Sequence, residues 1–376
     1  MKRILITSTE VLMLHFLVPH VKNLRKSGYD VEIACSEVLG RFDELREVLG
    51  ELVVIHKVDL KRSPARIKNL RGLSDLKQII REGNYDMVWT NEPVMGVMTR
   101  LAARKLRKRG LKVLYMTHGF HFYKGSDRLN WVLFYPVEWT MAHLTDVLVT
   151  INQEDYALAR KRMHAGRIKY IHGIGLDTEY FRNREVNVKE MRNTLGIPEQ
   201  AVVLLSVGEL QRRKNHEVML RALAKMDYSN VYYIICGEGE LNNYLHELTA
   251  SLGIAEHVLF LGYRRDISEL CKCADIFVHP SRREGLGIAA LEGMASGLPI
   301  VASQINGILD YTTDGETGYN CMPMDADSFC GAINTLTADK ALREKMGTCA
   351  GERTKAYDIG IAKKEVLQII EECVGR

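Results

Sequence analysis

Short apolar runs separated by amphipathic segments recur along the whole chain. The runs cover residues 3–7, 29–35, 53–58, 86–90, 113–117 and 146–151 in the first half, and 201–207, 231–236, 258–261, 276–278 and 299–302 in the second. Runs of this length, bounded by glycine, proline or polar residues and alternating with helical patterns, are typical of strands in parallel sheets. The pattern predicts an α/β protein with two parallel sheets, joined by a glycine-bearing linker near residues 173–177.

Residues 275–303 show this organisation in its most compact form. A strand at 276–278 is followed by a turn, by a helical pattern at 286–296 and by a second buried strand at 299–302. Strand, helix and strand in this order predict one βαβ unit of a parallel sheet. Because ligands of such sheets bind where strands give way to helices, the turn before residue 286 is a candidate ligand-binding site.

The composition fits two domains. The chain has 376 residues, of which 46% are apolar and 26% charged, and this length is enough for two cores. No apolar run reaches about 18 residues, and the first residues read as a strand rather than a signal peptide. We therefore expect a cytoplasmic protein. Its eight cysteines show no paired CxxC spacing, so we expect reduced, packed thiols.

The net charge of +4 conceals an asymmetry between the halves. Residues 1–178 hold 29 Lys and Arg against 19 Asp and Glu, whereas residues 179–376 hold 22 against 28. The basic half predicts an anionic partner, which we expect to be a membrane surface or a lipid-linked substrate rather than nucleic acid. Residues 100–112 carry seven cations, and four of them, Arg100, Arg104, Arg107 and Lys108, share one helical face. This face suits anionic lipid, and a solvated cationic face remains the alternative.

The turn at 284–287 combines glycines with acidic residues. Gly285 and Gly287 allow a ligand to approach the backbone at a helix N-terminus, which favours a diphosphate. Glu284 and Glu292 are eight residues apart, so along a helix they would fall on one face and accept hydrogen bonds from sugar hydroxyls. Ordinary helix carboxylates are the alternative. These features together suggest a ligand that carries both a diphosphate and sugar hydroxyls, and a nucleotide sugar has this combination.

The order of residues around this turn resembles a known family. Glu-Gly-Leu-Gly at 284–287, Glu292 and Ala-Ser-Gly-Leu-Pro-Ile-Val-Ala at 295–302 are similar to the Glu-x7-Glu signature of the family 4 retaining glycosyltransferases, which have the GT-B fold. The resemblance implies two Rossmann-like domains facing a central cleft. It places an acceptor domain at 1–178, a nucleotide-sugar domain at 179–356 and, at 357–376, a terminal helix that crosses back to the first domain.

A cationic loop follows the first strand of the second half. The family pattern has arginine directly after Gly208 and lysine five residues later; Lys214 matches, but Glu209 stands at the arginine position. Arg212 or Arg213 is the expected substitute, and a capsule and exopolysaccharide subgroup of the family resembles this chain in having Gly-Glu-Leu here. Such cations neutralise the charge of a departing nucleotide. A solvated loop is the alternative for Lys214.

The resemblance assigns roles to further residues. Glu284 is expected to hold donor-sugar hydroxyls, Glu292 the ribose, Lys214 the phosphates and His118 the donor sugar, with a strand cap as the alternative for His118. The expected catalytic residues are His118, Glu284 and Lys214. The expected donor site consists of Gly208, Arg212, Arg213, Lys214, Gly237, Tyr263, Arg264, Glu284, Gly285, Leu286, Gly287 and Glu292. The expected acceptor contacts are His15, Arg62, Glu92 and His121.

The implied reaction is retaining transfer of a hexosyl or N-acetylhexosaminyl group. The donor is a nucleotide sugar, expected to be UDP-linked, and the acceptor is a saccharide or lipid-linked saccharide in polysaccharide assembly. We expect no metal and no cofactor; Asp325-Ala326-Asp327 resembles a metal motif, but its position before a helical pattern favours a helix cap. A UDP-sugar epimerase of the same fold and a non-catalytic nucleotide-sugar-binding subunit are the alternatives.

Overall fold

The computed structural model describes residues 1–38, 42–50, 53–61, 69–227 and 229–375. The chain divides into two compact units, of which one comprises Met1–Gly175 with Ile359–Arg376 and the other Leu176–Asp358. The predicted boundary after residue 178 lies three residues beyond Gly175, and the one after residue 356 lies two residues before Asp358. Of the predicted site residues, Arg62 lies outside the described residues.

The first unit is built on a seven-stranded parallel sheet of order β3-β2-β1-β4-β5-β6-β7. The strands are β1 Arg3–Glu10, β2 Asp30–Val38, β3 Ile55–Lys57, β4 Met87–Asn91, β5 Lys112–Met116, β6 Val147–Thr150 and β7 Arg167–Tyr170. The central strands are buried on both faces because helices cover the sheet on each side. This doubly wound order brings the carboxyl ends of β1, β4 and β5 together at one edge.

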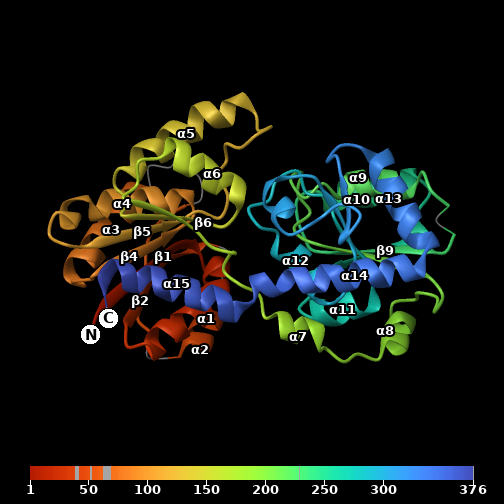
Figure 1. Cartoon of the computed structure of the whole chain (residues 1–376), viewed down its shortest axis with the longest axis horizontal. Coiled ribbons are helices and arrows are strands. Elements are labelled where there is room, and N and C mark those ends of the chain that lie inside the picture. Colours follow the sequence, from red (N-terminus) through yellow and green to blue (C-terminus); the bar gives the residue numbers. More distant parts are fainter. Residues whose placement is uncertain (39–41, 51–52, 62–68, 228, 376) are drawn as a thin grey trace. The chain divides into compact units, whose positions relative to one another are not determined.

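Within the described residues, seven helices surround this sheet. They are α1 Val11–Lys26, α2 Phe42–Leu49, α3 Asn69–Glu82, α4 Pro93–Arg107, α5 Arg128–Ala142, α6 Gln153–Arg162 and the C-terminal α15 Ile359–Val374. Figure 1 shows α1, α2 and α15 on one face of the sheet and α3, α4, α5 and α6 on the other. The last helix packs on α1, so the end of the chain belongs to the first unit.

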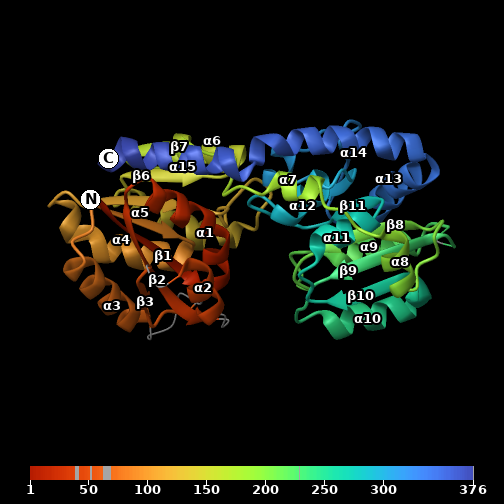
Figure 2. The same ribbon diagram turned by 90° about the horizontal axis from the view of Figure 1, so that it is seen from below.

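The second unit has a six-stranded parallel sheet of order β10-β9-β8-β11-β12-β13. The strands are β8 Val202–Val207, β9 Val231–Cys236, β10 Val258–Gly262, β11 Ile276–His279, β12 Ile300–Ser303 and β13 Gly318–Cys321. The helices are α7 Thr178–Arg182, α8 Val188–Thr194, α9 His216–Leu223, α10 Asn242–Ser251, α11 Ile267–Cys273, α12 Ile288–Ala295, α13 Ala326–Ala338 and α14 Lys340–Thr354. Contacts of α9 with α10 and α13, and of α12 with α11 and α14, form two helical layers, which lie on opposite sides of the sheet in Figure 1. Figure 2 shows the unit from the side of α11 and α14.

The prediction that residues 146–151 form the last strand of the first sheet is wrong. Strand β7, Arg-Ile-Lys-Tyr, continues the sheet beyond β6. It is a four-residue edge strand with an exposed arginine, so it lacks the apolar run by which the buried strands are found. Strand β3 is also shorter than the predicted 53–58, since only Ile55–Lys57 pairs with β2.

The predicted cationic face of residues 100–112 is only partly present. Helix α4 ends at Arg107, and Arg100 is 1% exposed because it pairs with Glu138 of α5. Arg107 pairs with Asp146 at 2.9 Å, whereas Arg104 and Lys108 are exposed. Helical periodicity places Arg100 on the surface, because the sequence does not reveal its buried partner 38 residues away.

Two further observations concern membranes and metals. None of the helices within the described ranges is both long and apolar enough to cross a bilayer. Asp325 caps α13, where its carboxylate accepts hydrogen bonds from the backbone N–H groups of Asp327 and Ser328 at 3.0 and 3.2 Å. The helix-cap interpretation of this motif is confirmed.

Candidate active site

The turn between β11 and α12 is held by packing against the segment after β12. Gly287 lies in the left-handed region with φ 80°, and a Cβ there would lie 2.8 Å from Ile308 and 3.2 Å from His279. Tyr311 donates a hydrogen bond to the backbone carbonyl of Leu286 at 2.7 Å. Helix α12 begins at Ile288, two residues later than predicted, so Glu284 lies in the turn and helical spacing does not place it on one face with Glu292. The glycine conformation ends the turn before the helix starts.

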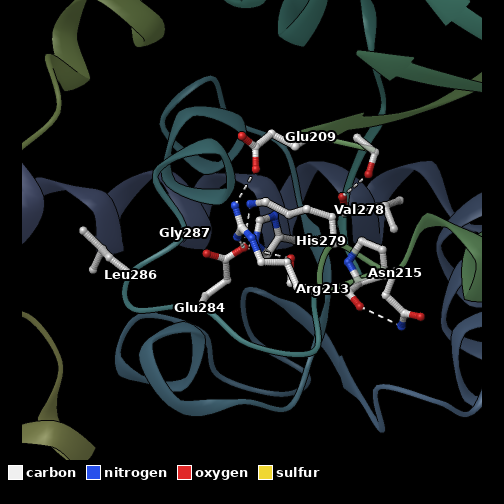
Figure 3. A network of polar contacts seen from close by, with 12 residues as sticks. Glu209, Arg213, Asn215, Val278, His279, Glu284, Leu286 and Gly287 are labelled. Carbon is white, nitrogen blue, oxygen red and sulfur yellow. Dashed lines mark hydrogen bonds and ion pairs between the residues drawn. The ribbon is translucent and has the colours of Figure 1, made fainter. Parts of the chain in front are cut away.

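Glu284 is the centre of a buried polar cluster, shown in Figure 3. Its Oε1 accepts hydrogen bonds from Lys214 Nζ at 2.6 Å and from Ser281 Oγ at 2.8 Å, and lies 3.3 Å from His279 Nε2. Burial raises the pKa of Glu284, but the positive charge of Lys214 and the other donors outweigh it and hold the pKa well below its usual range. The carboxylate is therefore ionised at neutral pH.

The cations of the loop after β8 converge on this carboxylate. Lys214 brings its ammonium to Glu284. Arg213 Nη1 lies 3.7 Å from the same oxygen, and Arg213 Nη2 donates a hydrogen bond to Glu209 at 2.9 Å (Figure 3). Glu209, the residue that departs from the family pattern, thus orients Arg213. Arg212 is exposed and lies outside this cluster. Of the two expected substitutes, the structure brings Arg213 to the turn.

Close backbone packing brings the ends of neighbouring strands together. A Cβ at Gly237, after β9, would lie 1.9 Å from the carbonyl oxygen of Gly208, after β8. The stem of Lys214 packs against Gly208, where a Cβ would lie 3.1 Å from Lys214 Cε. A Cβ at Gly307 would lie 2.0 Å from the carbonyl oxygen of Gly285. Glycine at these positions keeps the carboxyl edge of the sheet free of side chains, so a ligand can reach backbone groups.

Glu292 differs from Glu284 in its surroundings. It lies half-buried in the middle of α12, and burial raises the pKa of its carboxyl to about 7, although the charge of Lys214 opposes this rise. A carboxyl with this pKa titrates near neutral pH, so small changes in its surroundings decide its charge. Such a group suits an acceptor for hydroxyl groups of a ligand.

Tyr263 and Arg264, which are predicted donor-site residues, follow β10, and two strands separate β10 from β11 in the sheet. Arg264 pairs with Asp266 through two hydrogen bonds, from Nε at 2.8 Å and from Nη2 at 2.5 Å. Tyr263 is 50% exposed at the carboxyl end of β10. Because Asp266 holds the guanidinium of Arg264, Tyr263 is the better placed of the two side chains to stack on a planar ligand.

Further buried polar groups lie at this edge, at the end of β12, in the loop after it and at the start of α9. Both carboxamide atoms of Asn306 and the hydroxyl of Ser303 lack a hydrogen-bond partner among the described residues. His216 at the start of α9 is 3% exposed, and burial lowers the pKa of this histidine to about 3. Buried polar groups without partners are rare, so each of these groups is a candidate for contact with a ligand. Their only sequence signal is that each lies in or after the turn that follows a buried strand.

The first unit has a polar cluster of its own at the ends of β1, β4 and β5. His118 Nε2 lies 3.1 Å from Asn91 Oδ1, and burial lowers the pKa of His118 to about 4. Next to Asn91, Glu92 adopts φ 64° and accepts hydrogen bonds from Ser8 Oγ at 2.7 Å and from the Thr9 N–H at 2.5 Å. The structure therefore brings two predicted residues, His118 and Glu92, to one edge.

The remaining acceptor candidates have other neighbours. The ring of His121 lies against Phe134 with centroids 4.5 Å apart, at the border of an aromatic cluster. His15 is half-buried in the first turns of α1, which follows directly on β1. Both remain predictions for acceptor contact.

Comparison with known proteins identifies the family. The profile of "Glycosyltransferase Family 4" matches residues 18–180, and that of "Glycosyl transferases group 1" matches residues 187–353. The glycosyltransferase EpsD of Bacillus subtilis (strain 168) is 36% identical over 338 residues, which cover 88% of this chain and 86% of EpsD. The chain belongs to the family 4 glycosyltransferases.

Two further proteins match over similar lengths. An Escherichia coli enzyme, the UDP-Gal:alpha-D-GlcNAc-diphosphoundecaprenol alpha-1,3-galactosyltransferase, is 27% identical over 89% of this chain and 87% of its own. Among solved structures, Anabaena HepE in complex with UDP and glucose aligns with a TM-score of 0.82 at 19% identity, covering 99% of this chain and 100% of HepE. This likeness confirms the GT-B fold. As a family 4 member the chain is a glycosyltransferase.

Proposed function

We propose that this enzyme transfers a hexosyl or N-acetylhexosaminyl group from a UDP-sugar to a lipid-linked saccharide, with retention of the anomeric configuration, during exopolysaccharide assembly. Three similarities support the proposal: EpsD by its sequence, the Escherichia coli galactosyltransferase by its UDP-sugar donor and diphosphoundecaprenol-linked acceptor, and HepE by its complexes with UDP and UDP-glucose. The observation that carries it is the ionised Glu284, bound to Lys214 beside a glycine turn at a sheet edge.

The cluster divides into groups for phosphate and groups for hydroxyls. Lys214 and Arg213 bind the diphosphate and stabilise the negative charge that grows on its β-phosphate as the bond to the sugar breaks. They supply the charge compensation that Mg²⁺ provides in other transferases, so the reaction needs no metal. When the diphosphate binds the ammonium of Lys214, the Glu284 carboxylate is released from the lysine. It can then accept hydrogen bonds from sugar hydroxyls. Glu292 holds the ribose in the same way.

The chemical step proceeds on one face of the sugar. The bond between C1 and the phosphate oxygen breaks, and the acceptor hydroxyl oxygen forms a bond to C1 from the side that the phosphate leaves. The hydroxyl proton moves to the departing phosphate oxygen, so no protein side chain forms a covalent intermediate. His118, neutral because of its low pKa, donates or accepts a hydrogen bond at the donor sugar.

The acceptor part of the proposal implies attachment to the inner face of the plasma membrane. A lipid-linked saccharide resides at a bilayer surface, and the first unit carries most of the chain's excess positive charge, since residues 1–178 hold 29 Lys and Arg against 19 Asp and Glu. Peripheral attachment would bring enzyme and acceptor together without a spanning helix.

A donor panel tests the proposal. The purified enzyme is incubated with UDP-, GDP- and ADP-sugars, with and without a lipid-linked saccharide, and nucleotide release is followed with and without EDTA. We expect UDP release that requires the acceptor, is insensitive to EDTA and gives an axial product from an axial donor, as read by NMR of the anomeric proton. Turnover of the UDP-sugar without acceptor would indicate an epimerase, and absence of turnover with every donor would contradict catalysis.

A further inference from the structure

Helix α5 carries its apolar side chains on the outside. Exposed positions recur at the spacing i, i+3, i+4, i+7 and i+8, which forms one continuous stripe along a helix. Val132 is 69% and Leu129 64% exposed, and the helix lies at the upper margin of the first unit in Figure 1, beyond α4 and α6. The α5 stripe consists of Leu129, Val132, Leu133, Pro136 and Val137, with Trp139 exposed at its border.

The acidic residue of this helix faces inward. Glu138 is 7% exposed, and its two carboxylate oxygens accept hydrogen bonds from Arg100 Nη2 and from Tyr115 OH, each at 2.9 Å. Arg100 also donates from Nε to the Gly96 carbonyl at 2.8 Å, and its guanidinium lies 3.9 Å from the centre of the Tyr115 ring. These contacts fix the rotation of α5 about its axis, so the α5 stripe faces outward. A helix on the surface of a water-soluble domain has the opposite arrangement.

The surroundings of the stripe are strongly basic. Residues 93–170, which include α4, α5 and α6, hold 14 Lys and Arg against 5 Asp and Glu. One of those acids is the buried Glu138, so no exposed acid lies within α5. Exposed cations of α4, α5, α6 and their flanking residues include Arg104, Lys105, Lys108, Lys124, Arg128, Arg160, Lys161 and Arg162. Exposed apolar residues bordered by cations complement a surface that is apolar inside and anionic at its rim.

We propose that the α5 stripe inserts into the surface of an anionic lipid bilayer, with the neighbouring cations on its headgroups. The proposal rests on the lipid-linked acceptor of the proposed function, but its evidence is the inverted polarity of α5. Half-buried Trp131 and Tyr135 lie under the stripe, and the guanidinium of Arg162 is 5.6 Å from the Trp131 ring. Aromatic rings beside arginine are typical of the interface between headgroups and acyl chains.

The position of α5 in the chain gives this contact a consequence for the reaction. The segment between β5 and α5 carries His118 and His121, and Phe122 of this segment packs on Trp131 and Tyr135 of the helix. Seating α5 in a bilayer therefore places this segment at headgroup level. That is the depth at which the diphosphate of a lipid-linked saccharide lies, so the membrane contact presents the acceptor to the edge of the first sheet.

The test is sedimentation with vesicles of phosphatidylglycerol and phosphatidylcholine in equal parts, without any nucleotide sugar. The triple variant Leu129→Gln, Val132→Gln, Leu133→Gln removes the stripe and keeps helix formers on the surface. We expect wild type to sediment with these vesicles and less with pure phosphatidylcholine. Because burying one large apolar side chain changes a partition constant by roughly tenfold, the triple variant should bind at least about a hundredfold more weakly.

A matched control and a folding check accompany the variant. Met322 and Met324 of the second unit are 60% and 65% exposed, and the variant Met322→Gln, Met324→Gln should sediment like wild type. The triple variant should unfold at the wild-type temperature, since its side chains are exposed. It should also keep its turnover with a short-chain acceptor that lacks the polyprenyl tail, while turnover with vesicle-bound acceptor falls in proportion to vesicle binding.

Two outcomes overturn the proposed membrane contact, and a third contradicts the proposed function instead. Sedimentation of the triple variant at the wild-type level would exclude the stripe as the lipid contact. Light scattering that shows a wild-type dimer, broken by the triple variant, in a protein that does not bind vesicles would make the stripe a self-association surface. Tight vesicle binding by a protein that transfers no sugar would instead contradict the proposed function and leave the membrane contact standing.

Discussion

Two buried carboxylate–cation pairs, one in each unit, have the same chemistry and different surroundings. Glu284 and Lys214 of the second unit are 2.6 Å apart, and Glu138 and Arg100 of the first unit are 2.9 Å apart. Glu138 uses both oxygens on protein donors, and Arg100 is covered by Gly96 and Tyr115. At Glu284 the contacts from Lys214, Ser281 and His279 all reach one oxygen, Oε1, beside a glycine turn. Position at a sheet edge therefore distinguishes the pair that we propose binds the ligand from the pair that stabilises the fold.

The largest expected effect concerns the stability of the first unit. Arg100→Met leaves Glu138 buried without its cation, which should reduce the free energy of unfolding by about 3–5 kcal/mol. All three tryptophans, Trp89, Trp131 and Trp139, lie in the first unit, so their fluorescence in a urea titration reports this unit alone.

Two control variants distinguish the loss of the buried pair from the loss of a positive charge alone. Arg104→Met removes an exposed cation on the same helix and should change stability by less than about 0.5 kcal/mol. Adding Glu138→Leu to Arg100→Met should restore part of the loss, because the uncompensated charge is gone. Equal effects of Arg100→Met and Arg104→Met would show that the pair does not hold α5.

The second effect falls on turnover. Lys214→Ala removes the cation that we place on the leaving diphosphate, and kcat should fall by about 10²–10³, the range found when one preorganised donor is deleted. Tryptophan fluorescence should show an unchanged first unit. Lys225→Ala, which removes an exposed lysine of the same unit paired with Asp327, is the control and should keep wild-type turnover.

The different surroundings of these pairs explain what the sequence could predict. Glu284, Gly287 and Lys214 lie in short motifs after apolar runs, so their convergence followed from the parallel-sheet pattern. The rest depended on packing: the left-handed turn at Gly287 separates Glu284 from the helix, and Arg100 finds Glu138 on another helix. Periodicity reports which residues share a face but not which partner covers it. The edge strand β7 was missed for a related reason, since it is short and polar.

A third effect depends on pH through Glu292. Its folded-state pKa of about 7 lies above the ordinary value of 4.5, so between these values the folded protein binds more protons than the unfolded chain. Stability of the second unit should therefore fall as pH rises from about 5 to about 7, by on the order of 2 kcal/mol. Glu292→Gln should remove this slope in the calorimetric transition that UDP shifts. A slope unchanged by the variant would place the titrating group elsewhere.

The smallest effect tests Asn306, whose carboxamide has no hydrogen-bond partner among the described residues. Asn306→Leu preserves volume and removes both hydrogen-bonding atoms, and KM for the nucleotide sugar should rise by about tenfold, the cost of one hydrogen bond to a charged or well-placed ligand group. Stability should be unchanged or higher, because a buried unsatisfied amide is removed. Asn243→Leu, at an exposed position of α10, is the control. Wild-type KM in Asn306→Leu would exclude this side chain from the donor site.

A crystal structure of the protein with UDP bound tests the central claim most directly. We expect the diphosphate to lie within hydrogen-bond distance of Lys214 Nζ and against the backbone of residues 285–287. The ribose should lie at Glu292, and the Glu284 carboxylate should be released from the lysine. A nucleotide bound at any other edge of the second sheet, with the contact between Glu284 and Lys214 intact, would contradict it.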